Sequence, residues 1–242
     1  MSGGLRLSQV EFFGRTLAEC LDMFALSVEE LRTGRTLDCP SGPDSFVAEA
    51  NDAGCEVVGI DPQLACSPEE LRFLGLDSLA RCEQMIRDRP EALTFRDVDA
   101  FLRAKHDALE RFLADYEAHR GDGRYVAASL PRLPFADRSF DRVCAANFLF
   151  SYAPIEAGGL YEGHEFDLPF HLRAIEEIAR IARHEIRLVP MGSFDPPPRP
   201  HAYRDPAIAR LRELGFTVEL VPTRFDSGLA ALNDVLVARR TA

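Results

Sequence analysis

The chain has 242 residues, 46% of them hydrophobic and 28% charged, which fits one globular α/β domain or one domain with an insertion. Its net charge of −11 disfavours nucleic acid and anionic membrane surfaces as main partners, since both bind basic surfaces. No apolar run approaches the roughly 20 residues of a membrane span, and the N-terminus lacks the pattern of a signal peptide. We therefore expect a cytoplasmic protein.

The N-terminal part predicts helices. Residues 7–33 carry apolar side chains at helical spacing and favour two helices with a break near residues 25–27. Ser27 followed by Glu30 is typical of a capping box at the start of the second helix.

A strand–helix–strand unit follows. Residues 35–38 predict a short first strand, and Asp44 or Ser45 is expected to cap a helix that ends at Gly54. Residues 55–60, CEVVGI, are a β-branched apolar run that predicts a buried strand of a parallel sheet. Such a βαβ unit is right-handed by default.

Residues 67–120 predict a helical insertion. Ser67 and Pro68 favour a helix start, and the charged, helix-patterned chain continues to Arg120 with a break at Arg89 and Pro90. A crossover between two strands needs one helix, whereas this stretch is long enough for two or three.

The rest of the chain again alternates between predicted strands and predicted helices. We expect strands over residues 124–129, 141–147, 185–189, 216–221 and 233–238, and helices over residues 169–183 and 206–214. The predicted fold is therefore a Rossmann-like, doubly wound α/β sheet of seven strands, mostly parallel with an antiparallel last strand. We expect a single domain over residues 1–242, in which residues 1–33 and 67–120 form a helical cap.

Two carboxylates are expected at the ligand-binding edge of this sheet. Ligands of open parallel sheets bind beyond the carboxyl ends of the strands, where Asp38 and Asp61 end the first and second strands. A carboxylate at the end of the second strand commonly accepts the hydroxyls of a ribose. Asp61 is followed by a proline, so the alternative is an Asp-Pro turn without a ligand.

The turn after the first strand indicates which cofactor would fit. A dinucleotide needs a glycine-rich turn with free N–H groups, but here only Gly42 is a glycine and Pro40 and Pro43 each lack an N–H. Asp44 adds a negative charge where a phosphate would lie. S-adenosylmethionine has a sulfonium and an amino group but no phosphate, so an acidic turn suits it.

At this point the sequence resembles the class I S-adenosylmethionine-dependent methyltransferases, over nearly its whole length. LDCPSGPDSF matches the acid and the middle glycine of their first motif, with Pro40 and Asp44 in place of the outer glycines. SLPRLPFADRSFDRVCAANFLF resembles their third and fourth strands, with Ser129 where an acid is usual. AIEEIARI followed by EIRLVP resembles a later helix and strand, although the usual Pro-Gly-Gly turn is missing.

The resemblance implies roles for particular residues. Those that would contact the methionine part are Asp38, Cys39, Pro40 and Gly42, and Asp61 would hold the ribose. Those that would border the adenine are Pro62 or Gln63 with Ser129 and Leu130, and Asn147 and Phe148 would face the sulfonium. For each, the alternative is a turn or strand-end residue without a ligand.

The acceptor is expected between the helical cap and the loop of residues 148–171. His171 or His164 is a candidate base, needed only if the acceptor arrives protonated, and Tyr152 is a candidate for positioning the acceptor. Alternatively, His171 bonds a turn at a helix start and His164 is solvated. The cap and the acidic charge favour a small-molecule acceptor, and no metal site is predicted because the histidine and cysteine spacings do not fit one.

Two other functions compete with this prediction. The replaced glycines also fit a non-catalytic protein that keeps the fold and binds a cofactor or a partner. A nicotinamide oxidoreductase would need the glycines that the turn lacks. The sequence leaves the acceptor and the oligomeric state open.

Overall fold

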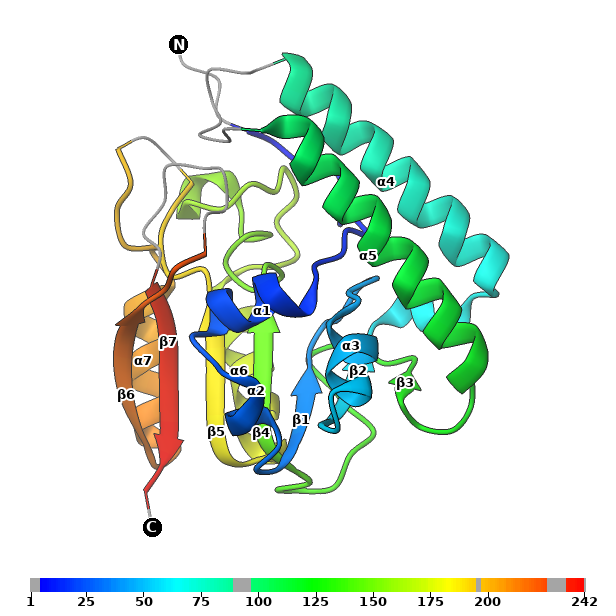
Figure 1. Ribbon diagram of the computed structural model, residues 1–242. Helices are drawn as coiled ribbons and strands as arrows, with labels where there is room; N and C mark the ends of the chain where they lie inside the picture. Colours follow the sequence, from blue (N-terminus) through cyan, green and yellow to red (C-terminus); the bar gives the residue numbers. More distant parts are fainter. Residues whose placement is uncertain (1–4, 89–96, 195–196, 226–233, 242) are drawn as a thin grey trace.

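The computed structural model describes residues 5–88, 97–194, 197–225 and 234–241. Its centre is one seven-stranded sheet with the order β3-β2-β1-β4-β5-β7-β6 (Figure 1). The strands are β1 (Arg35–Asp38), β2 (Glu56–Ile60), β3 (Tyr125–Val126), β4 (Phe140–Ala146), β5 (Ala182–Val189), β6 (Phe216–Pro222) and β7 (Asp234–Arg240). β7 is antiparallel to β5 and β6, and the other neighbouring strands are parallel. The predicted fold class is confirmed.

The strand order reverses between β1 and β4. From β1 the chain moves outward through β2 to β3, and from β4 it moves to the opposite edge. Asp38 therefore pairs with Gly59 of β2 on one side and Cys144 of β4 on the other. This switch point places the carboxyl end of β1 in the crevice where open α/β sheets bind ligands.

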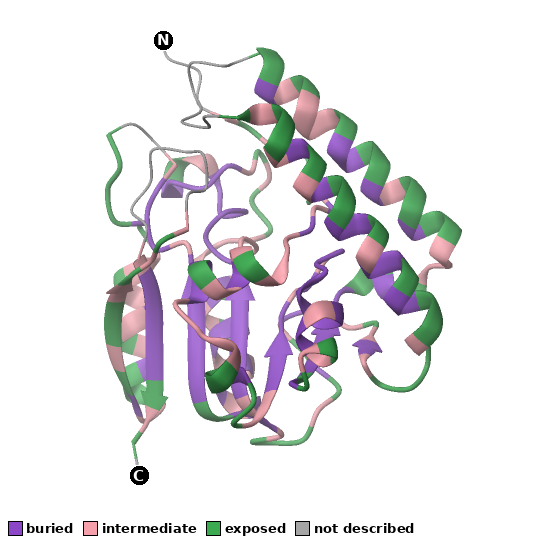
Figure 2. Cartoon of the chain, viewed as in Figure 1, coloured by how far each residue is buried: buried purple, intermediate pink, exposed green. Residues whose placement is uncertain are grey.

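Helices cover both faces of the sheet. α6 (Leu168–Ile181) and α7 (Arg204–Glu213) pack on one face, while α1 (Leu17–Phe24), α2 (Val28–Leu31) and α3 (Phe46–Asp52) pack on the other (Figure 1). Both faces of the central strands are buried, as Figure 2 shows. Alternate side chains of a strand point to opposite faces, so Val58 joins the α6 side and Val57 the α1 side.

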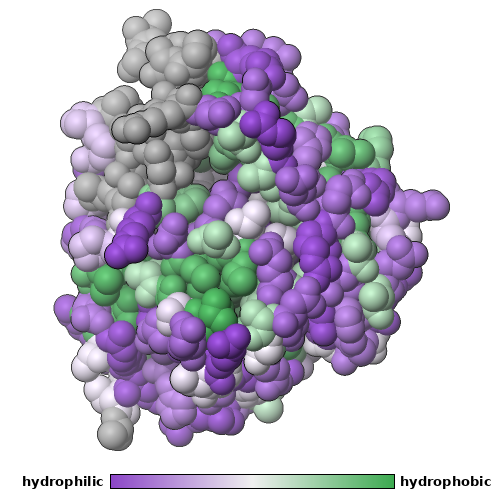
Figure 3. Space-filling view, in the orientation of Figure 1, coloured by the Kyte–Doolittle hydropathy of each residue, from purple (hydrophilic) through white to green (hydrophobic). Residues whose placement is uncertain are grey.

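The insertion between β2 and β3 contains two long helices in its described part. α4 (Pro68–Asp88) and α5 (Val98–His119) lie side by side in Figure 1, and Ser67 and Glu70 form a capping box at the start of α4. Leu71 and Phe112 pack into the α1 side of the core, whereas the outer surface of the two helices is largely hydrophilic (Figure 3). The predicted break at Arg89 and Pro90 lies outside the described residues.

The N-terminal helix prediction is wrong for residues 7–16. α1 begins at Leu17, and residues 5–15 form an irregular segment, with one bridge at Leu7 and a bend at residues 8–9, that we call the N-terminal strap. Its backbone forms hydrogen bonds with another loop and not within a helix. The Leu7 N–H donates to Leu160 O at 2.7 Å, and the Glu162 N–H donates to Leu7 O at 3.0 Å. The apolar residues of the strap are spaced as in a helix, but they contact several different parts of the molecule and not one common face.

Two smaller predictions also need correction. The strand expected over residues 124–129 is only Tyr125–Val126, because the following turn holds two prolines that donate no hydrogen bonds to a ladder. α3 begins after Ser45 as predicted, but its start has no side-chain cap because Ser45 Oγ bonds Glu49 instead.

Candidate functional site

The turn after β1 is held against β2 and forms one wall of the site. Gly42 has a φ of +52°, a left-handed conformation that glycine adopts without steric cost. The Ser41 N–H donates to Ile60 O at 2.7 Å, which ties the turn to the end of β2. This geometry brings the Gly42 backbone to the edge of the sheet with no side chain in front of it.

The strap presses directly on this turn. A Cβ atom on Gly14 would come within 2.2 Å of Pro43 O, so only glycine fits there. The Arg15 N–H donates to Asp44 Oδ1 at 2.5 Å, and the Ser45 N–H donates to Arg15 O at 2.9 Å. The strap thus fixes the position of Arg15 beside the turn.

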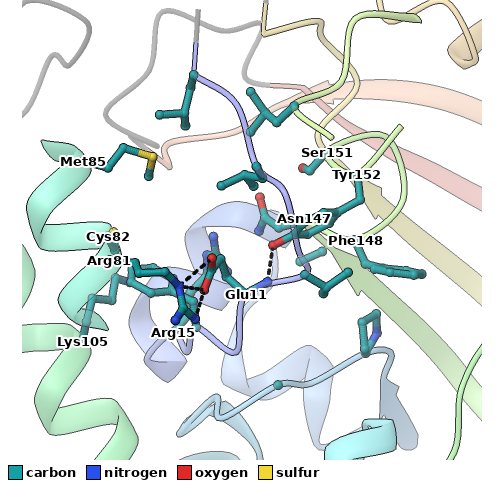
Figure 4. A pocket seen from close by; sticks show the side chains of 18 of the residues that line it. Glu11, Arg15, Arg81, Cys82, Met85, Lys105, Asn147, Phe148, Ser151 and Tyr152 are labelled. Carbon is teal, nitrogen blue, oxygen red and sulfur yellow. Dashed lines mark hydrogen bonds and ion pairs between the residues drawn. The ribbon is translucent and has the colours of Figure 1, made fainter. Parts of the chain in front are cut away.

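A cavity of about 360 Å³ opens at the carboxyl ends of β1, β2 and β4. Figure 4 shows its two sides: Arg81, Cys82, Met85 and Lys105 come from α4 and α5, and Asn147, Phe148, Ser151 and Tyr152 from the loop after β4. Pro40, Gly42 and Asp61 line it from the strand ends, and the strap forms a further wall. Its volume is that of a small-molecule site.

Asp38 is a buried acid with unusual surroundings. It is 1% exposed, and neither of its carboxylate oxygens has a hydrogen-bond partner among the residues that the structure describes. Burial raises its pKa well above the ordinary value, and the nearby charge of Asp44 raises it further. Buried polar groups are nearly always paired, so this carboxylate points to a ligand that supplies the partner.

Two more acids adjoin the same turn. Burial raises the pKa of Asp44 to about 7, and burial raises that of Asp61 to about 6. Asp61 Oδ1 accepts a hydrogen bond from the Gln63 N–H at 2.8 Å and so caps the short 3₁₀ helix Pro62–Ala65. Asp61 therefore opens an Asp-Pro turn and also lines the cavity, and its contact with a ribose stays a prediction.

Arg15 is a site residue that the sequence did not reveal. Its guanidinium lies 3.1 and 3.3 Å from the amide oxygen of Asn147, in the amide orientation that satisfies both groups. Its charge lowers the pKa of both Asp38 and Asp44 against the effect of burial. Arginine is abundant in this chain, so no pattern distinguished this one.

Lys105, the single lysine of the sequence, was also missed. It is 1% exposed, forms an ion pair with Glu19, and lies 5.4 and 5.0 Å from the ring centroids of Phe13 and Phe101. Burial lowers its pKa. Lysine was scarce for compositional reasons alone, so its burial in the cavity wall could be seen only in three dimensions.

Several predicted contact residues lie away from the cavity. Cys39 and Leu130 are buried in the core, whereas Pro62 and Ser129 are exposed. None of the four lines the cavity, and neither does Gln63 or Asp38. The adenine contacts that the resemblance implied therefore stay predictions.

Tyr152 and His171 differ in their placement. Tyr152 lines the cavity, its hydroxyl accepts a hydrogen bond from the Glu11 N–H at 2.9 Å, and burial raises its pKa to about 12. His171 lies outside the cavity: its Nε2 accepts from the Phe150 N–H at 2.9 Å, and its Nδ1 lies 2.9 Å from Asp167 O. Both ring nitrogens are engaged, which favours the structural interpretation of His171 over the base.

His164, the other candidate base, is exposed and lies 3.1 Å from Glu156. Within the described part of the chain, no group of three or more His, Cys, Asp and Glu side chains is arranged to hold a metal ion. Of the helices described, none is long and apolar enough to cross a bilayer.

Comparison with known proteins gives one relative by sequence and several similar structures. No protein-family model matches the chain. It is 28% identical over 191 residues to an uncharacterized protein of Methanocaldococcus jannaschii, covering 77% of this chain and 80% of that one.

Among solved structures, the chain is similar to magnesium protoporphyrin IX methyltransferase from Synechocystis PCC 6803 with bound SAM (14% identity, TM-score 0.45, 88% of this chain and 76% of that one). It is also similar to 1,6-didemethyltoxoflavin-N1-methyltransferase from Burkholderia thailandensis with bound S-adenosylhomocysteine (17%, 0.45, 93% and 79%). A third is a SAM-dependent methyltransferase from Aquifex aeolicus (13%, 0.42, 90% of each chain).

Proposed function

We propose that this protein is an S-adenosylmethionine-dependent methyltransferase that acts on a small-molecule acceptor. The observation that carries the proposal is the group of buried acids at the proline-containing turn, Asp38, Asp44 and Asp61, of which Asp38 has no partner among the described residues. Buried acids with raised pKa values become charged more easily beside a cation and less easily beside an anion, so they favour a cationic ligand and disfavour a phosphate. S-adenosylmethionine contains an adenosine and cationic groups but no phosphate, so it meets these requirements.

The residues present fit this cofactor. Asp44, which lines the cavity, would face its amino group, and Asp38, whose carboxyl is near enough to Asp44 to feel its charge, would act from just outside the lining. Arg15, fixed by the strap and by Asn147, would bind the cofactor carboxylate. Asp61 would accept the ribose hydroxyls, and Gly42 leaves room for close approach of the backbone. When bound, S-adenosylmethionine supplies a methyl group already activated by the sulfonium.

The chain's own contribution would be alignment and exclusion of water. The strap and the loop after β4 close over the strand ends, and Tyr152 on that loop would position the acceptor. The hydrogen bonds of His171 make it a support of that loop, so we assign it no proton transfer.

The test is calorimetric titration of the full-length protein with S-adenosylmethionine and with S-adenosylhomocysteine. The Asp61→Asn variant keeps an oxygen to cap the 3₁₀ helix but loses its charge and one acceptor. We expect it to weaken S-adenosylmethionine binding by about tenfold or more, the scale of a lost charged hydrogen bond. Asp38→Asn should weaken S-adenosylmethionine binding similarly.

The matched control is Asp205→Asn on α7, whose side chain is 76% exposed and which does not line the cavity. It should bind as the wild type does. Normal affinity in both the Asp38 and Asp61 variants would show that the cofactor does not rest on this turn.

The alternative is a protein that binds the cofactor or a partner without turnover. Pro40 and Asp44 in place of glycines favour it, because they alter the turn that holds the methionine part. Formation of S-adenosylhomocysteine in the presence of a small-molecule extract distinguishes the two. Tight cofactor binding without any product would favour the non-catalytic protein.

A further inference from the structure

We propose that the acceptor is an uncharged aromatic small molecule with one hydroxyl or amino group, and that Ser151 and Tyr152 bind that group. The inference rests on the proposed function and concerns the part of the cavity that faces the loop after β4. It assigns a role to Ser151 and a chemical class to the acceptor.

Ser151 has a hydroxyl that the fold itself does not use. The residue is 4% exposed and lines the cavity, and its Oγ has no hydrogen-bond partner in the described part of the chain. Its backbone is fixed on both sides: the Ser151 N–H donates to Leu149 O at 2.9 Å, and the Leu160 N–H donates to Ser151 O at 2.8 Å. A buried hydroxyl held in place without a partner is rare and indicates that a ligand completes its hydrogen bonding.

Tyr152 supplies a second hydroxyl on the same side of the cavity (Figure 4). Its oxygen accepts from the Glu11 N–H, so its own proton remains to be donated. Ser151 can donate or accept. The two residues together therefore match a group that both donates and accepts, such as a hydroxyl or an amine.

Besides polar residues such as Glu11 and Asn147, apolar side chains line the cavity on both sides (Figure 4). Phe148, Leu160, Phe194 and Met85 line the cavity. The ring of Phe148 already packs against Tyr152 with centroids 6.0 Å apart, a geometry that a further aromatic ring can extend. These walls favour a flat aromatic body.

The charged side chains that α4 and α5 contribute to the cavity form ion pairs with other residues of the protein. Arg81 pairs with Glu11 at 2.7 Å and also with Asp77, and Lys105 pairs with Glu19. Arg15 is assigned to the cofactor carboxylate, and Arg6, which also lines the cavity, is exposed to solvent. A charged acceptor would have to compete with these ion pairs, whereas an uncharged one would not.

The experiment uses three probes of matched size, naphthalene, 2-naphthol and 2-naphthoate, titrated into the full-length protein saturated with S-adenosylhomocysteine. Binding is followed by ligand-observed NMR. We expect 2-naphthol to bind about tenfold more tightly than the other two, the typical effect of satisfying a buried hydroxyl. Ser151→Ala should remove most of the preference for 2-naphthol over naphthalene while leaving the affinity for S-adenosylhomocysteine unchanged.

Ser193→Ala is the control, because Ser193 Oγ is also buried and unpartnered among the described residues but Ser193 does not line the cavity. It should bind all three probes as the wild type does. The inference is overturned if 2-naphthoate binds best, if none of the probes binds, or if Ser151→Ala keeps the full preference for 2-naphthol. Failure of S-adenosylhomocysteine to bind at all would instead overturn the proposed function, on which the inference depends.

Discussion

At the scale of single residues, the loop after β4 is where the backbone is strained. Asn147 and Phe150 have φ values of +53° and +70°, in the left-handed region that costs a phenylalanine roughly 1–3 kcal/mol. His171 holds Phe150 in place through its Nε2, which places the imidazole proton on Nδ1, facing Asp167 O. This strained loop carries Phe148, Ser151 and Tyr152 into the cavity, so its support matters to the site.

We predict that His171→Ala lowers the stability of the protein. The loss of a buried hydrogen bond and of ring packing should cost about 3 kcal/mol and lower the melting temperature by roughly 6–12 °C. His184→Ala, at a side chain that is 69% exposed, should change stability by less than about 0.5 kcal/mol. A His171→Ala protein that melts normally but has lost turnover would restore the base interpretation.

The same residue should make the loop sensitive to acid. Burial lowers the pKa of His171, so the neutral form is the folded one and its contribution is complete above the ordinary pKa of histidine. As the pH falls through the lowered pKa, protonation removes the acceptor that Phe150 uses, and this contribution is lost.

At the scale of elements, a buried ion pair joins the inserted helices α4 and α5 to the helices that cover the sheet. Lys105 on α5 pairs with Glu19 on α1, and the aromatic rings of Phe13 and Phe101 adjoin the lysine. Breaking a buried pair leaves an uncompensated charge, which costs far more than losing an exposed pair. The packing of α5 on α1 therefore depends on both partners being present.

We predict that Lys105→Met destabilises the free protein by about 3 kcal/mol, and that adding Glu19→Gln restores most of it. Urea denaturation of the two single variants and the double variant measures the coupling. Arg87→Met, which removes an exposed pair with Glu83 within α4, should cost less than about 0.5 kcal/mol. Additive effects in the Lys105 and Glu19 variants would show that the pair does not join α5 to α1.

At the scale of the whole molecule, the buried acids couple the binding of a cationic ligand to the release of protons. The pKa values of about 7 for Asp44 and about 6 for Asp61 mean that Asp44 is partly protonated at neutral pH and that Asp61 becomes protonated as the pH falls toward 6. A bound cation favours the charged carboxylates and lowers these pKa values, so binding releases protons. A ligand whose binding releases protons binds more tightly as the pH rises.

We predict that the affinity for S-adenosylmethionine increases between about pH 6 and pH 8, and that the binding enthalpy differs between phosphate and Tris buffers. Calorimetry at several pH values measures both effects. Asp61→Asn should show a smaller pH dependence than the wild type. An affinity independent of both pH and buffer would contradict a cationic ligand at these acids.

The sequence predicted the fold well because the fold depends on local patterns. The apolar runs at β1, β2 and β4 are bounded by glycine, proline and aspartate, and the amphipathic pattern of α6 repeats at helical spacing. These patterns were sufficient for the sheet, its antiparallel last strand and the helical insertion. The strap was misjudged because its apolar residues, although spaced as in a helix, contact different elements.

By itself, the sequence placed Asp38 and Asp61 at the ends of β1 and β2 and Gly42 in the turn after β1. Strand ends and turns could be read from the sequence because they depend on neighbouring residues of the chain. Only the tertiary structure decided that Arg15, Lys105 and Ser151 line the same cavity and that His171 supports a loop. The reason is physical: strand-end positions follow from local backbone geometry, whereas burial and long-range hydrogen bonds depend on which distant segments meet when the chain folds.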